Sequence, residues 1–310
     1  MRRTFGAHGH LIHDPATGLT HRAPRPAPPG RLTLDDRDVT TWPIAPPAKQ
    51  NRSTPLSICW SPLVRCNLHC PQCLDDTSLP EAGRPERHRI AGVLADADIL
   101  GIDISGGEPL LLPDLADLAR TVTAGGKAAL SVTTNGWHLA RRADELAEVI
   151  DAIRVSLDGP DPHSHDTIRG AGSFTRAIDG IHAARAAGLT VQTQMVLMNS
   201  TKTHAQRAID LAAHLGVGGV TFLQMLPIGA AADLTAEMLT DAEATDILNR
   251  LDAPPDLRVR LRSREAASGF TVIRADGRVW RNSPHAAQIT GLRPLHQATD
   301  LTLTGKDGSA

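Results

Sequence analysis

The feature that most constrains the fold is an alternation of two kinds of segment, which begins near residue 55. Short runs rich in β-branched residues alternate with longer stretches whose apolar residues recur at helical spacing. Such repeated βα units predict an α/β fold around a parallel sheet, a partial (β/α)6 barrel of the TIM type. An open flavodoxin-like sheet has the same alternation, and periodicity alone does not separate the two. The predicted strands span Leu56–Trp60, Ile102–Ser105, Ala128–Thr133, Ala152–Leu157, Thr190–Leu197 and Gly219–Met225. The predicted helices span Arg84–Ala97, Leu115–Ala124, Leu139–Val149, Phe174–Ala187 and His204–Leu215.

Residues 1–50 lack this regular pattern. Prolines crowd the stretch from Ala23 to Gly30 and recur at Pro46 and Pro47, and proline sustains neither a helix nor a central strand. We therefore predict an irregular, Pro-rich N-terminal extension over residues 1–50. A flexible or extended arm is the simpler interpretation, and a strand that docks a substrate or partner is the alternative.

The pattern changes again after Pro254 and Pro255. Leu257–Leu261 predicts a strand, and Asp276-Gly277 is typical of a hairpin turn between short strands at 271–273 and 279–280. We predict a barrel core over residues 51–252, followed by a small β-rich C-terminal appendage over residues 253–310.

The overall charge and hydropathy narrow the choice of partners. The 310-residue chain carries a formal net charge of −2, whereas nucleic-acid-binding domains are usually basic, so a nucleic-acid partner is not expected. No apolar run approaches the roughly 20 residues that span a bilayer, which predicts no membrane partner. The basic start at Met1–Gly6 has no apolar segment behind it, unlike a secretory signal. We expect a cytoplasmic location.

All four cysteines fall within one short stretch, at Cys59, Cys66, Cys70 and Cys73. The last three have the spacing C-x3-C-x2-C directly after a predicted strand, so one loop can present three thiolates to a metal. Iron–sulfur clusters are usually held by four cysteines, and three leave one iron open to another ligand. A structural zinc site, with Cys59 or His69 as its fourth ligand, is the alternative, although such sites commonly pair two cysteine knuckles and the chain has one. Within its predicted strand, Cys59 is expected to be a small buried residue.

The cysteine spacing, with Asn67 after the first cysteine, resembles the signature of the radical S-adenosylmethionine (SAM) superfamily. The resemblance implies that Cys66, Cys70 and Cys73 hold a catalytic 4Fe–4S cluster whose open iron chelates SAM. It also implies that an electron from the cluster breaks a C–S bond of SAM and gives a 5′-deoxyadenosyl radical. Gln72, inside the same loop, is a candidate SAM contact.

The motif Gly106-Gly107-Glu108-Pro109 follows the second predicted strand and resembles the family's GGEP motif. Two glycines allow the backbone to approach a ligand closely, and a carboxylate accepts a charge-assisted hydrogen bond from an ammonium group. The resemblance implies that these four residues lie at SAM and that Glu108 contacts its amino group. Without the cysteine loop one βα unit earlier, an ordinary surface turn would be the better interpretation.

Further candidates follow the third and fourth predicted strands. Asn135 lies in a Thr-Asn-Gly turn of the kind that lies near SAM in the family, although Asn-Gly is also a common simple turn. The S-L-D-G run that begins at Ser156, with the H-D-x-x-R-G run after it, resembles the SPASM/twitch branch of the superfamily. The resemblance implies that Ser156 contacts SAM and that the guanidinium of Arg169 pairs with its carboxylate. Asp158 and His165 are interpreted as loop-stabilising caps.

The C-terminal segment departs from the SPASM/twitch pattern. Phe270–Asn282 resembles the hairpin that opens such a domain, where a cysteine normally follows the D-G turn. Asn282 stands at that place, and no cysteine follows it in the sequence. We therefore predict a degenerate twitch-like cap without an auxiliary cluster, which shapes substrate access.

These expectations combine into one enzyme hypothesis. The resemblance implies hydrogen abstraction from a substrate seated over the barrel, with an external low-potential electron donor such as flavodoxin or ferredoxin. It suggests a ribosomally synthesised peptide as the substrate, which would make the chain a peptide maturase. A sugar, aminoglycoside or other small natural-product intermediate is the alternative substrate. A non-catalytic zinc-binding interaction protein is the hypothesis from another class.

Overall fold

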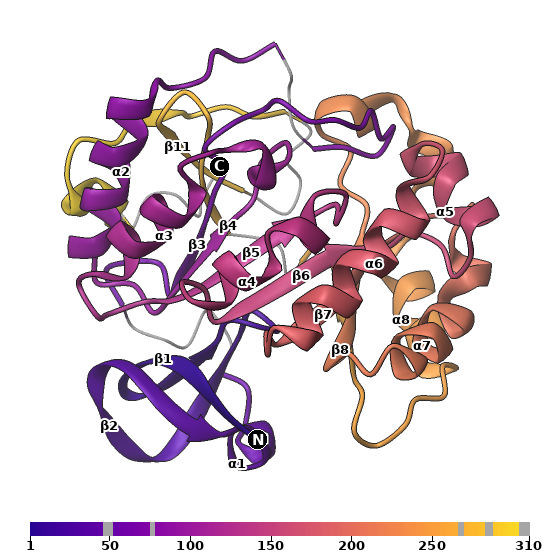
Figure 1. The fold of residues 1–310 in the computed structure, drawn as a ribbon, viewed down its shortest axis with the longest axis horizontal. Helices are drawn as coiled ribbons and strands as arrows, with labels where there is room; N and C mark the ends of the chain where they lie inside the picture. The colour runs from indigo at the N-terminus through magenta and orange to yellow at the C-terminus, as the bar shows by residue number, and fades with distance from the viewer. Residues whose placement is uncertain (46–51, 75–77, 266–269, 283–287, 304–310) are drawn as a thin grey trace.

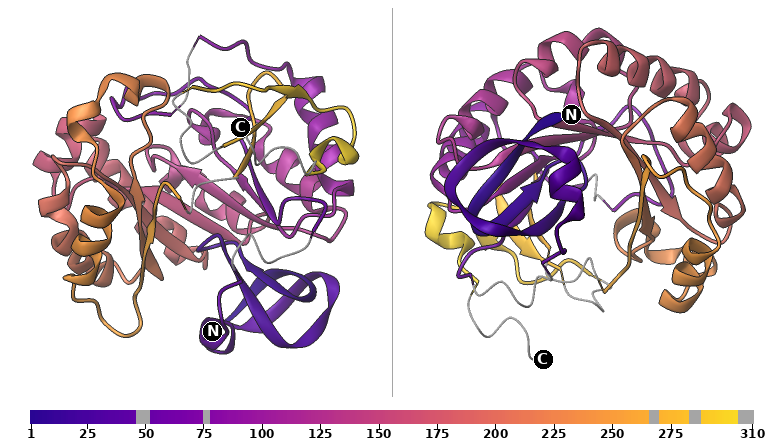
Figure 2. Two further views of the ribbon diagram at one scale, coloured as in Figure 1. Left: turned by 180° about the vertical axis from the view of Figure 1, so that it is seen from behind. Right: turned by 90° about the horizontal axis from the view of Figure 1, so that it is seen from below.

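The computed structural model describes residues 1–45, 52–74, 78–265, 270–282 and 288–303. Most of its strands belong to one curved sheet, which helices cover on the outside (Figures 1 and 2). The strands of this sheet are β3 (Ser57–Trp60), β4 (Gly101–Ile104), β5 (Ala129–Thr134), β6 (Ala152–Ser156), β7 (Val191–Leu197), β8 (Gly219–Gln224), β9 (Arg258–Arg262), β10 (Thr271–Ile273), β11 (Arg278–Arg281) and β12 (Arg293–Pro294). The helices around it are α2 (Arg84–Asp96), α3 (Leu115–Thr123), α4 (Ala143–Ala147), α5 (Pro162–Arg169), α6 (Ser173–Ala186), α7 (Ala205–His214) and α8 (Asp241–Asn249).

Strands β3 to β8 are parallel and pair in sequence order, so the predicted α/β partial barrel is confirmed. Each predicted strand is present, and the predicted helices are α2, α3, α4, α6 and α7. Helices α5 and α8 were not predicted from the sequence. Both follow the carboxyl end of a strand, and α5 begins with a proline at its first position, which favours a helix start there.

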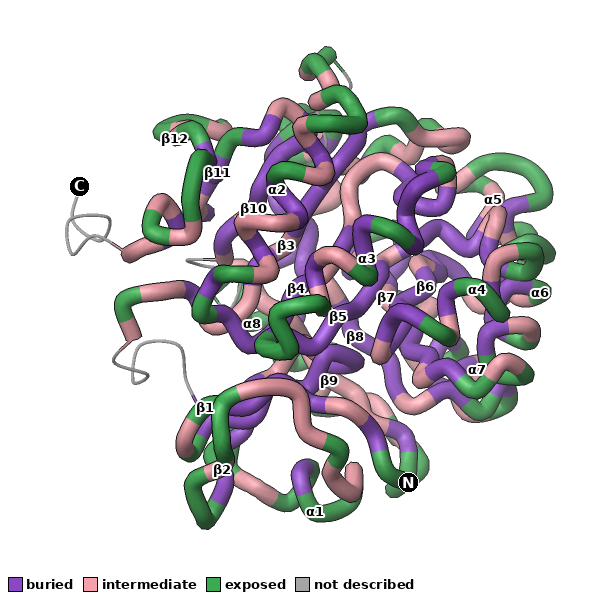
Figure 3. The backbone as a smooth tube through the Cα atoms, turned by 60° about the vertical axis from the view of Figure 1, so that its left-hand side comes forward, coloured by how far each residue is buried: buried purple, intermediate pink, exposed green. Residues whose placement is uncertain are grey.

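The hydrophobic core lies between the sheet and the surrounding helices, where Ile104 and Phe222 are fully buried. The opposite, inner face of the sheet carries polar side chains at alternating positions. On this face Asp103 of β4 accepts hydrogen bonds from Ser131 (2.8 Å) and Thr133 (2.9 Å) of β5. Figure 3 shows the buried residues concentrated along the strands.

The C-terminal tail extends the barrel sheet instead of standing beside it, which corrects the predicted appendage. Strand β9 pairs in parallel with β8, and β10 pairs in parallel with β3, so tail strands lie on both sides of the six core strands. The predicted Asp276-Gly277 hairpin is confirmed, because β10 and β11 are antiparallel. Within the described residues no strand ladder joins β9 to β10, and the barrel remains partial.

The N-terminal extension is not irregular, which corrects the prediction for residues 1–50. Strands β1 (Arg2–Asp14) and β2 (Leu19–Asp35) form a long antiparallel hairpin, followed by the short helix α1 (Asp36–Thr41). The four prolines of β2 fall between the paired positions, where the register shifts, so no ladder hydrogen bond is lost to them. Pro46 and Pro47 lie outside the described residues.

The hairpin lies against the end of the barrel where the strands begin, as the indigo ribbon in Figure 1 shows. Arg154 of β6 donates to the backbone carbonyls of Pro15 (2.5 Å) and Ala16 (2.9 Å) in the hairpin turn. Asp14 beside this turn is fully buried and bonds Arg3 of its own hairpin (2.9 Å) and Arg258 of β9 (3.2 Å). The hairpin therefore closes one end of the barrel and leaves the carboxyl ends of the strands for a site. None of the helices among the described residues is long and apolar enough to cross a membrane.

Candidate active site

The cysteine loop follows β3 at the carboxyl end of the barrel. Cys66, Cys70 and Cys73 are each partly exposed, as groups that receive a ligand from solution must be. Glu81 anchors the start of the loop, because its carboxylate accepts the backbone N–H groups of Val64 (3.0 Å) and Arg65 (2.8 Å). Sequence reasoning missed Glu81, since nothing in its local sequence connects it to the loop before it.

The sulfur atom of the first cysteine in the loop accepts two hydrogen bonds. The Cys66 Sγ atom accepts from the Leu68 backbone N–H (3.4 Å) and from the Asn135 side-chain amide (3.7 Å). Burial raises the pKa of the Cys66 thiol, and the charges of Glu108 and Cys70 raise it further, while the two hydrogen bonds lower it. Donors aimed at a cysteine sulfur are one of the means by which a protein tunes an iron–sulfur cluster.

The two glycines of the GGEP motif allow its backbone to lie close to the cysteine loop. A Cβ atom on Gly107 would lie 2.2 Å from the carbonyl oxygen of Arg65, and one on Gly106 would lie 2.5 Å from that of Leu63. The backbone of the motif instead pairs with the cysteine loop, since Gly107 N–H donates to Leu63 O (2.9 Å) and Glu108 N–H to Arg65 O (2.9 Å). The close approach is thus to the loop that carries the cysteines.

We predict that Gly107→Ala displaces the cysteine loop and lowers the iron bound per chain after anaerobic reconstitution. The reason is that backbone oxygen atoms, not flexible side-chain ends, would clash with the new Cβ atom. Gly92→Ala in α2 is the matched control, because a Cβ there meets nothing within 4 Å, and it should add about 1 kcal/mol of helix stability. Equal iron content in both variants, measured by a colorimetric iron assay, would contradict this role of Gly107.

Glu108 is fully buried and connects the ends of two strands. Its Oε1 atom accepts from Thr134 Oγ1 (2.7 Å) and Leu110 N–H (2.9 Å), and its Oε2 atom accepts from Asn135 N–H (2.8 Å). Burial raises the pKa of Glu108, although these donors and Arg169 favour its charged form. Pro109 starts a short 3-10 turn (Pro109–Leu111) that Glu108 caps.

A second network connects the cysteine loop to the end of β6. The Asp158 Oδ2 atom accepts from Gln72 Nε2 (2.6 Å) and Arg169 Nε (2.6 Å), and its Oδ1 atom accepts from Val196 N–H of β7 (2.7 Å). The Nδ1 atom of His165 accepts from the backbone N–H of Asp158 (3.2 Å), which agrees with the interpretation of both residues as loop-stabilising.

The orientation of Arg169 follows from this network. Asp158 holds its Nε atom, so the two terminal nitrogens of the guanidinium remain for a ligand. The charges of Cys70 and Cys73 are among those that raise the pKa of Arg169, although burial opposes them. Ser156 ends β6 with a partly exposed side chain on the inner face. The structure therefore brings the sequence-predicted residues of four strand ends to one place.

Two buried polar atoms next to the cysteines have no hydrogen-bond partner among the described residues. They are Oε1 of Gln72 and one amide nitrogen, Nδ2, of Asn67. Since buried polar groups are nearly always paired, such orphan atoms mark a place where a ligand completes the structure. Three thiolates with orphan polar groups beside them fit a 4Fe–4S cluster with one open iron and a polar ligand on it.

Within the described residues, neither alternative zinc ligand is grouped with the cysteines around one position. His69 is exposed, and Cys59 lies in β3. Cys59 is not the buried apolar residue that was expected, because it is partly exposed on the inner face of the barrel, while its neighbours Ile58 and Trp60 pack in the core.

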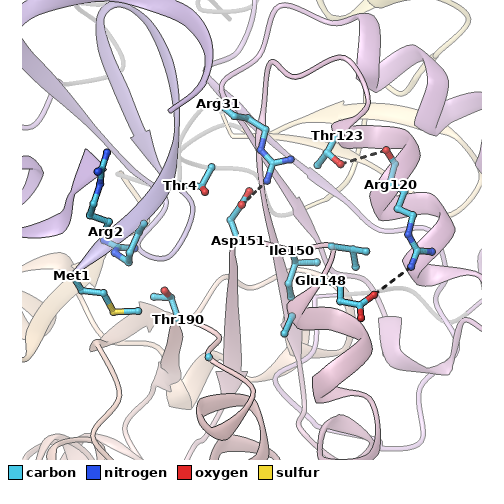
Figure 4. A pocket seen from close by; sticks show the side chains of 14 residues that line it. Met1, Arg2, Thr4, Arg31, Arg120, Thr123, Glu148, Ile150, Asp151 and Thr190 are labelled. Atoms are coloured by element: carbon cyan, nitrogen blue, oxygen red, sulfur yellow. Dashed lines mark hydrogen bonds and ion pairs between the residues drawn. The ribbon is translucent and has the colours of Figure 1, made fainter. Parts of the chain in front are cut away.

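An open surface pocket lies at the end of the barrel that carries the N-terminal hairpin, and Figure 4 shows the side chains that line it. Its lining combines the start of β1 with the segments that precede β6 and β7. The Arg31 and Asp151 side chains in it form an ion pair at 2.5 Å. Because none of the motif residues lines this pocket, we place the chemistry at the cysteine loop and not here.

Comparisons with known proteins agree with this site. Residues 60–212, which include the cysteine loop, the GGEP motif and Arg169, match the sequence profile of the radical SAM superfamily. Relatives named GTP 3′,8-cyclase from Bradyrhizobium diazoefficiens and Rhodopseudomonas palustris (strain TIE-1) are 33% and 34% identical over 175 and 176 residues. Each match covers 53% of this chain and 51% of the relative, so the chain matches about half the length of these curated relatives.

Solved structures share the fold at low sequence identity. SuiB of Streptococcus suis, bound to its precursor peptide SuiA, superposes with a TM-score of 0.63 over 76% of this chain and 60% of SuiB, at 15% identity. Methylornithine synthase superposes with a TM-score of 0.52 over 80% of each chain, at 12% identity. These likenesses concern the fold.

The barrel, the three-cysteine loop and the motifs around it define a class of protein, the SAM-dependent iron–sulfur enzymes. Residues 60–212 form a domain of the radical SAM superfamily, as the sequence motifs predicted. The cofactors of this domain are a 4Fe–4S cluster and SAM.

Proposed function

We propose that the chain cleaves SAM reductively at a single 4Fe–4S cluster and abstracts hydrogen from a substrate held in the barrel. The observation that carries the proposal is the convergence of four strand ends on the cysteine loop. Asn135 after β5 bonds Cys66, and Asp158 after β6 bonds Gln72 between Cys70 and Cys73. A loop with only a structural function would not need polar groups from so many strands.

In this proposal Cys66, Cys70 and Cys73 bind three irons, and the fourth iron is left for SAM. Among the described residues no three His, Cys, Asp or Glu side chains are grouped to share one metal ion. The single cysteine knuckle supports a cluster, whose cysteines bind three different irons, over a structural zinc ion, whose sites commonly pair two knuckles. When bound, the cluster supplies an electron that breaks a C–S bond of SAM and yields a 5′-deoxyadenosyl radical.

The other residues of the site bind and orient. Arg169, fixed through Nε by Asp158, presents its terminal nitrogens to the carboxylate of SAM. Gln72 Oε1 accepts from a donor on the ligand, and Ser156 offers a hydroxyl from the inner wall. Glu108 is held at the cysteine loop by its neighbours Gly106, Gly107 and Pro109. Its buried carboxylate is stabilised by a nearby cation, so it favours the positively charged amino group of SAM.

Two classes of substrate have support, a peptide and a small molecule. The SPASM/twitch resemblance and the fold of SuiB, which was crystallised with a precursor peptide, favour peptide modification. The relatives named GTP 3′,8-cyclase favour a small molecule. The hairpin closes one end of the barrel, and the inner wall is polar and cationic, which supports a small substrate in natural-product or cofactor biosynthesis over an extended chain. A cytoplasmic location with flavodoxin or ferredoxin as electron donor completes the proposal.

Anaerobic reconstitution of the purified chain tests the chemistry. We expect about four irons per chain with the brown colour of an iron–sulfur cluster, and 5′-deoxyadenosine when SAM and dithionite are added. Chromatography with mass detection measures that product. A colourless protein with one zinc ion per chain and no 5′-deoxyadenosine would refute the proposed function.

A further inference from the structure

Strand β9 turns arginine side chains toward the inside of the barrel. Its sequence alternates arginine with apolar residues, and Val259 and Leu261 pack against the core between the sheet and the helices. Because side chains alternate along a strand, Arg258, Arg260 and Arg262 face the interior. The inside of the barrel is thus lined by guanidinium groups where a folded protein usually places apolar residues.

These three arginines differ in their partners. Arg258 lies next to the N-terminal hairpin and pairs with Asp14 (3.2 Å) and Asp36 (3.1 Å). Arg260 and Arg262 make no hydrogen bond or ion pair within the part of the chain that the structure describes, and the Nε atom of Arg260 is buried without a partner. One face of Arg262 is covered by the Phe270 ring at 4.8 Å, so its position is fixed without any neutralisation of its charge.

The charges across the interior do not compensate for the two guanidiniums. Two described carboxylates act on these guanidiniums, and both are already paired: Asp103 of β4 with Arg154 of β6 (2.7 Å), and Asp14 with Arg3 and Arg258. Burial, followed by the charges of Arg262 and Arg154, lowers the pKa of Arg260 to about 9. Burial and Arg154 also lower the pKa of Arg262, although Cys59 and Asp103 oppose this.

A further unpartnered donor lies on the same wall. Gln192 of β7 is opposite Arg154 in the strand register and is 1% exposed, and its Nε2 atom has no hydrogen-bond partner among the described residues. A buried cation or amide without a partner destabilises a protein, and such groups are retained where a ligand satisfies them. Among the described residues, the inner wall therefore has donors and positive charge in excess of its acceptors.

We propose that Arg260 and Arg262 form an oxyanion-binding site on the inner wall of the barrel, which receives a phosphate or carboxylate group of the substrate. The inference rests on the proposed function, since it names the substrate class for the same barrel. The two arginines occupy successive inward positions, about 7 Å apart along the strand, so together they suit a group with two or more negative charges. The hairpin lies below this wall, and the rest of the substrate extends toward the cysteine loop.

Calorimetric titration of the anaerobically reconstituted holoenzyme tests the site with two probes, sodium pyrophosphate and sodium citrate. We expect wild-type protein to bind one anion per chain, and Arg260→Gln or Arg262→Gln to weaken that binding by at least about tenfold. The probe with the lower Kd shows whether the substrate group at this site is a phosphate or a carboxylate. Arg250→Gln removes the same charge from an arginine that is 74% exposed, and it should bind like wild type.

Measuring the Tm tests the proposal even for a variant that binds neither anion. In the absence of anions, Arg262→Gln should raise the Tm by roughly 2–5 °C, because it removes a partly buried charge that makes no ion pair within the described residues. Pyrophosphate should raise the Tm of wild type and leave that of the variant unchanged. A lower Tm of the variant in the absence of anions would contradict the excess of positive charge on which the site depends.

Three results would overturn the inference: no binding of either probe to wild type, undiminished binding by both glutamine variants, or loss of binding in Arg120→Gln. The last result would place the anion in the surface pocket of Figure 4, which Arg120 lines. Formation of 5′-deoxyadenosine by wild type with SAM alone is measured separately. Its absence would refute the proposed function, whereas the titrations decide on the anion site.

Discussion

Replacing Cys70 by alanine is expected to abolish the formation of 5′-deoxyadenosine from SAM and dithionite. Two thiolates remain in the loop, and they cannot hold a cluster that needs three corners fixed while one iron stays open. We expect the yield to fall by at least about a thousandfold, as when a member of a cooperating catalytic unit is removed. The absorbance of the cluster should be lost in the same variant.

Cys59→Ala is the matched control for this experiment. It removes a cysteine from the same short stretch of sequence, but from strand β3 and not from the loop. The variant should keep its iron content and its yield of 5′-deoxyadenosine. A Cys70→Ala protein that produces as much 5′-deoxyadenosine as wild type would remove the catalytic assignment altogether.

Asp14→Asn is expected to reduce the free energy of unfolding by about 3 to 5 kcal/mol. The Asp14 carboxylate is fully buried and accepts from Arg3, Arg258 and the Ala16 backbone N–H, so the amide leaves these two guanidiniums with Asp36 alone as counter-charge. Urea denaturation followed by circular dichroism measures the change. Asp38→Asn in helix α1 is the control, because Asp38 is exposed, and its effect should stay within about 0.5 kcal/mol.

The same carboxylate should make stability depend on pH. Burial alone would raise the pKa of Asp14, but the neighbouring charges of Arg3 and Arg258 outweigh it and hold this pKa well below its usual range. A depressed carboxyl pKa stabilises the fold above the unfolded-state value of about 3.9, and the contribution is lost as the pH falls below it. Wild type should therefore lose more stability than Asp14→Asn between pH 5 and about pH 2. Parallel losses in the two proteins would show that Asp14 is not responsible.

Much of the site could be predicted from the sequence because its residues lie in local motifs. The spacing of Cys66, Cys70 and Cys73 fixes three thiolates within one loop, and parallel strands place all the loops after them at one edge. Ser156 lies at the end of a predicted strand, and Asn135 and Arg169 each follow one, so their convergence was expected. The role of Glu108 as a connector between strand ends was not, since it depends on Thr134 and Asn135 in another loop.

The N-terminal hairpin could not be predicted because its stability comes from distant contacts. Local sequence rules treat a proline-rich segment as irregular, whereas here the prolines fall where the ladder shifts register. The ion pair between Asp14 and Arg258 joins residues 244 positions apart. Only the folded chain brings these charges together. The ion pairs between them help to hold the hairpin against the barrel.

The sequence by itself determined the βα alternation, the cysteine loop and the order of the motifs, because each depends on residues close together along the chain. The tertiary structure decided which face of each strand became the interior. The alternation of Arg258, Val259, Arg260, Leu261 and Arg262 is visible in the sequence, but a two-residue period does not say which side is covered. In a barrel wrapped by helices the apolar core lies outside the sheet, so the arginines of β9 face inward, toward the space that we assign to the substrate.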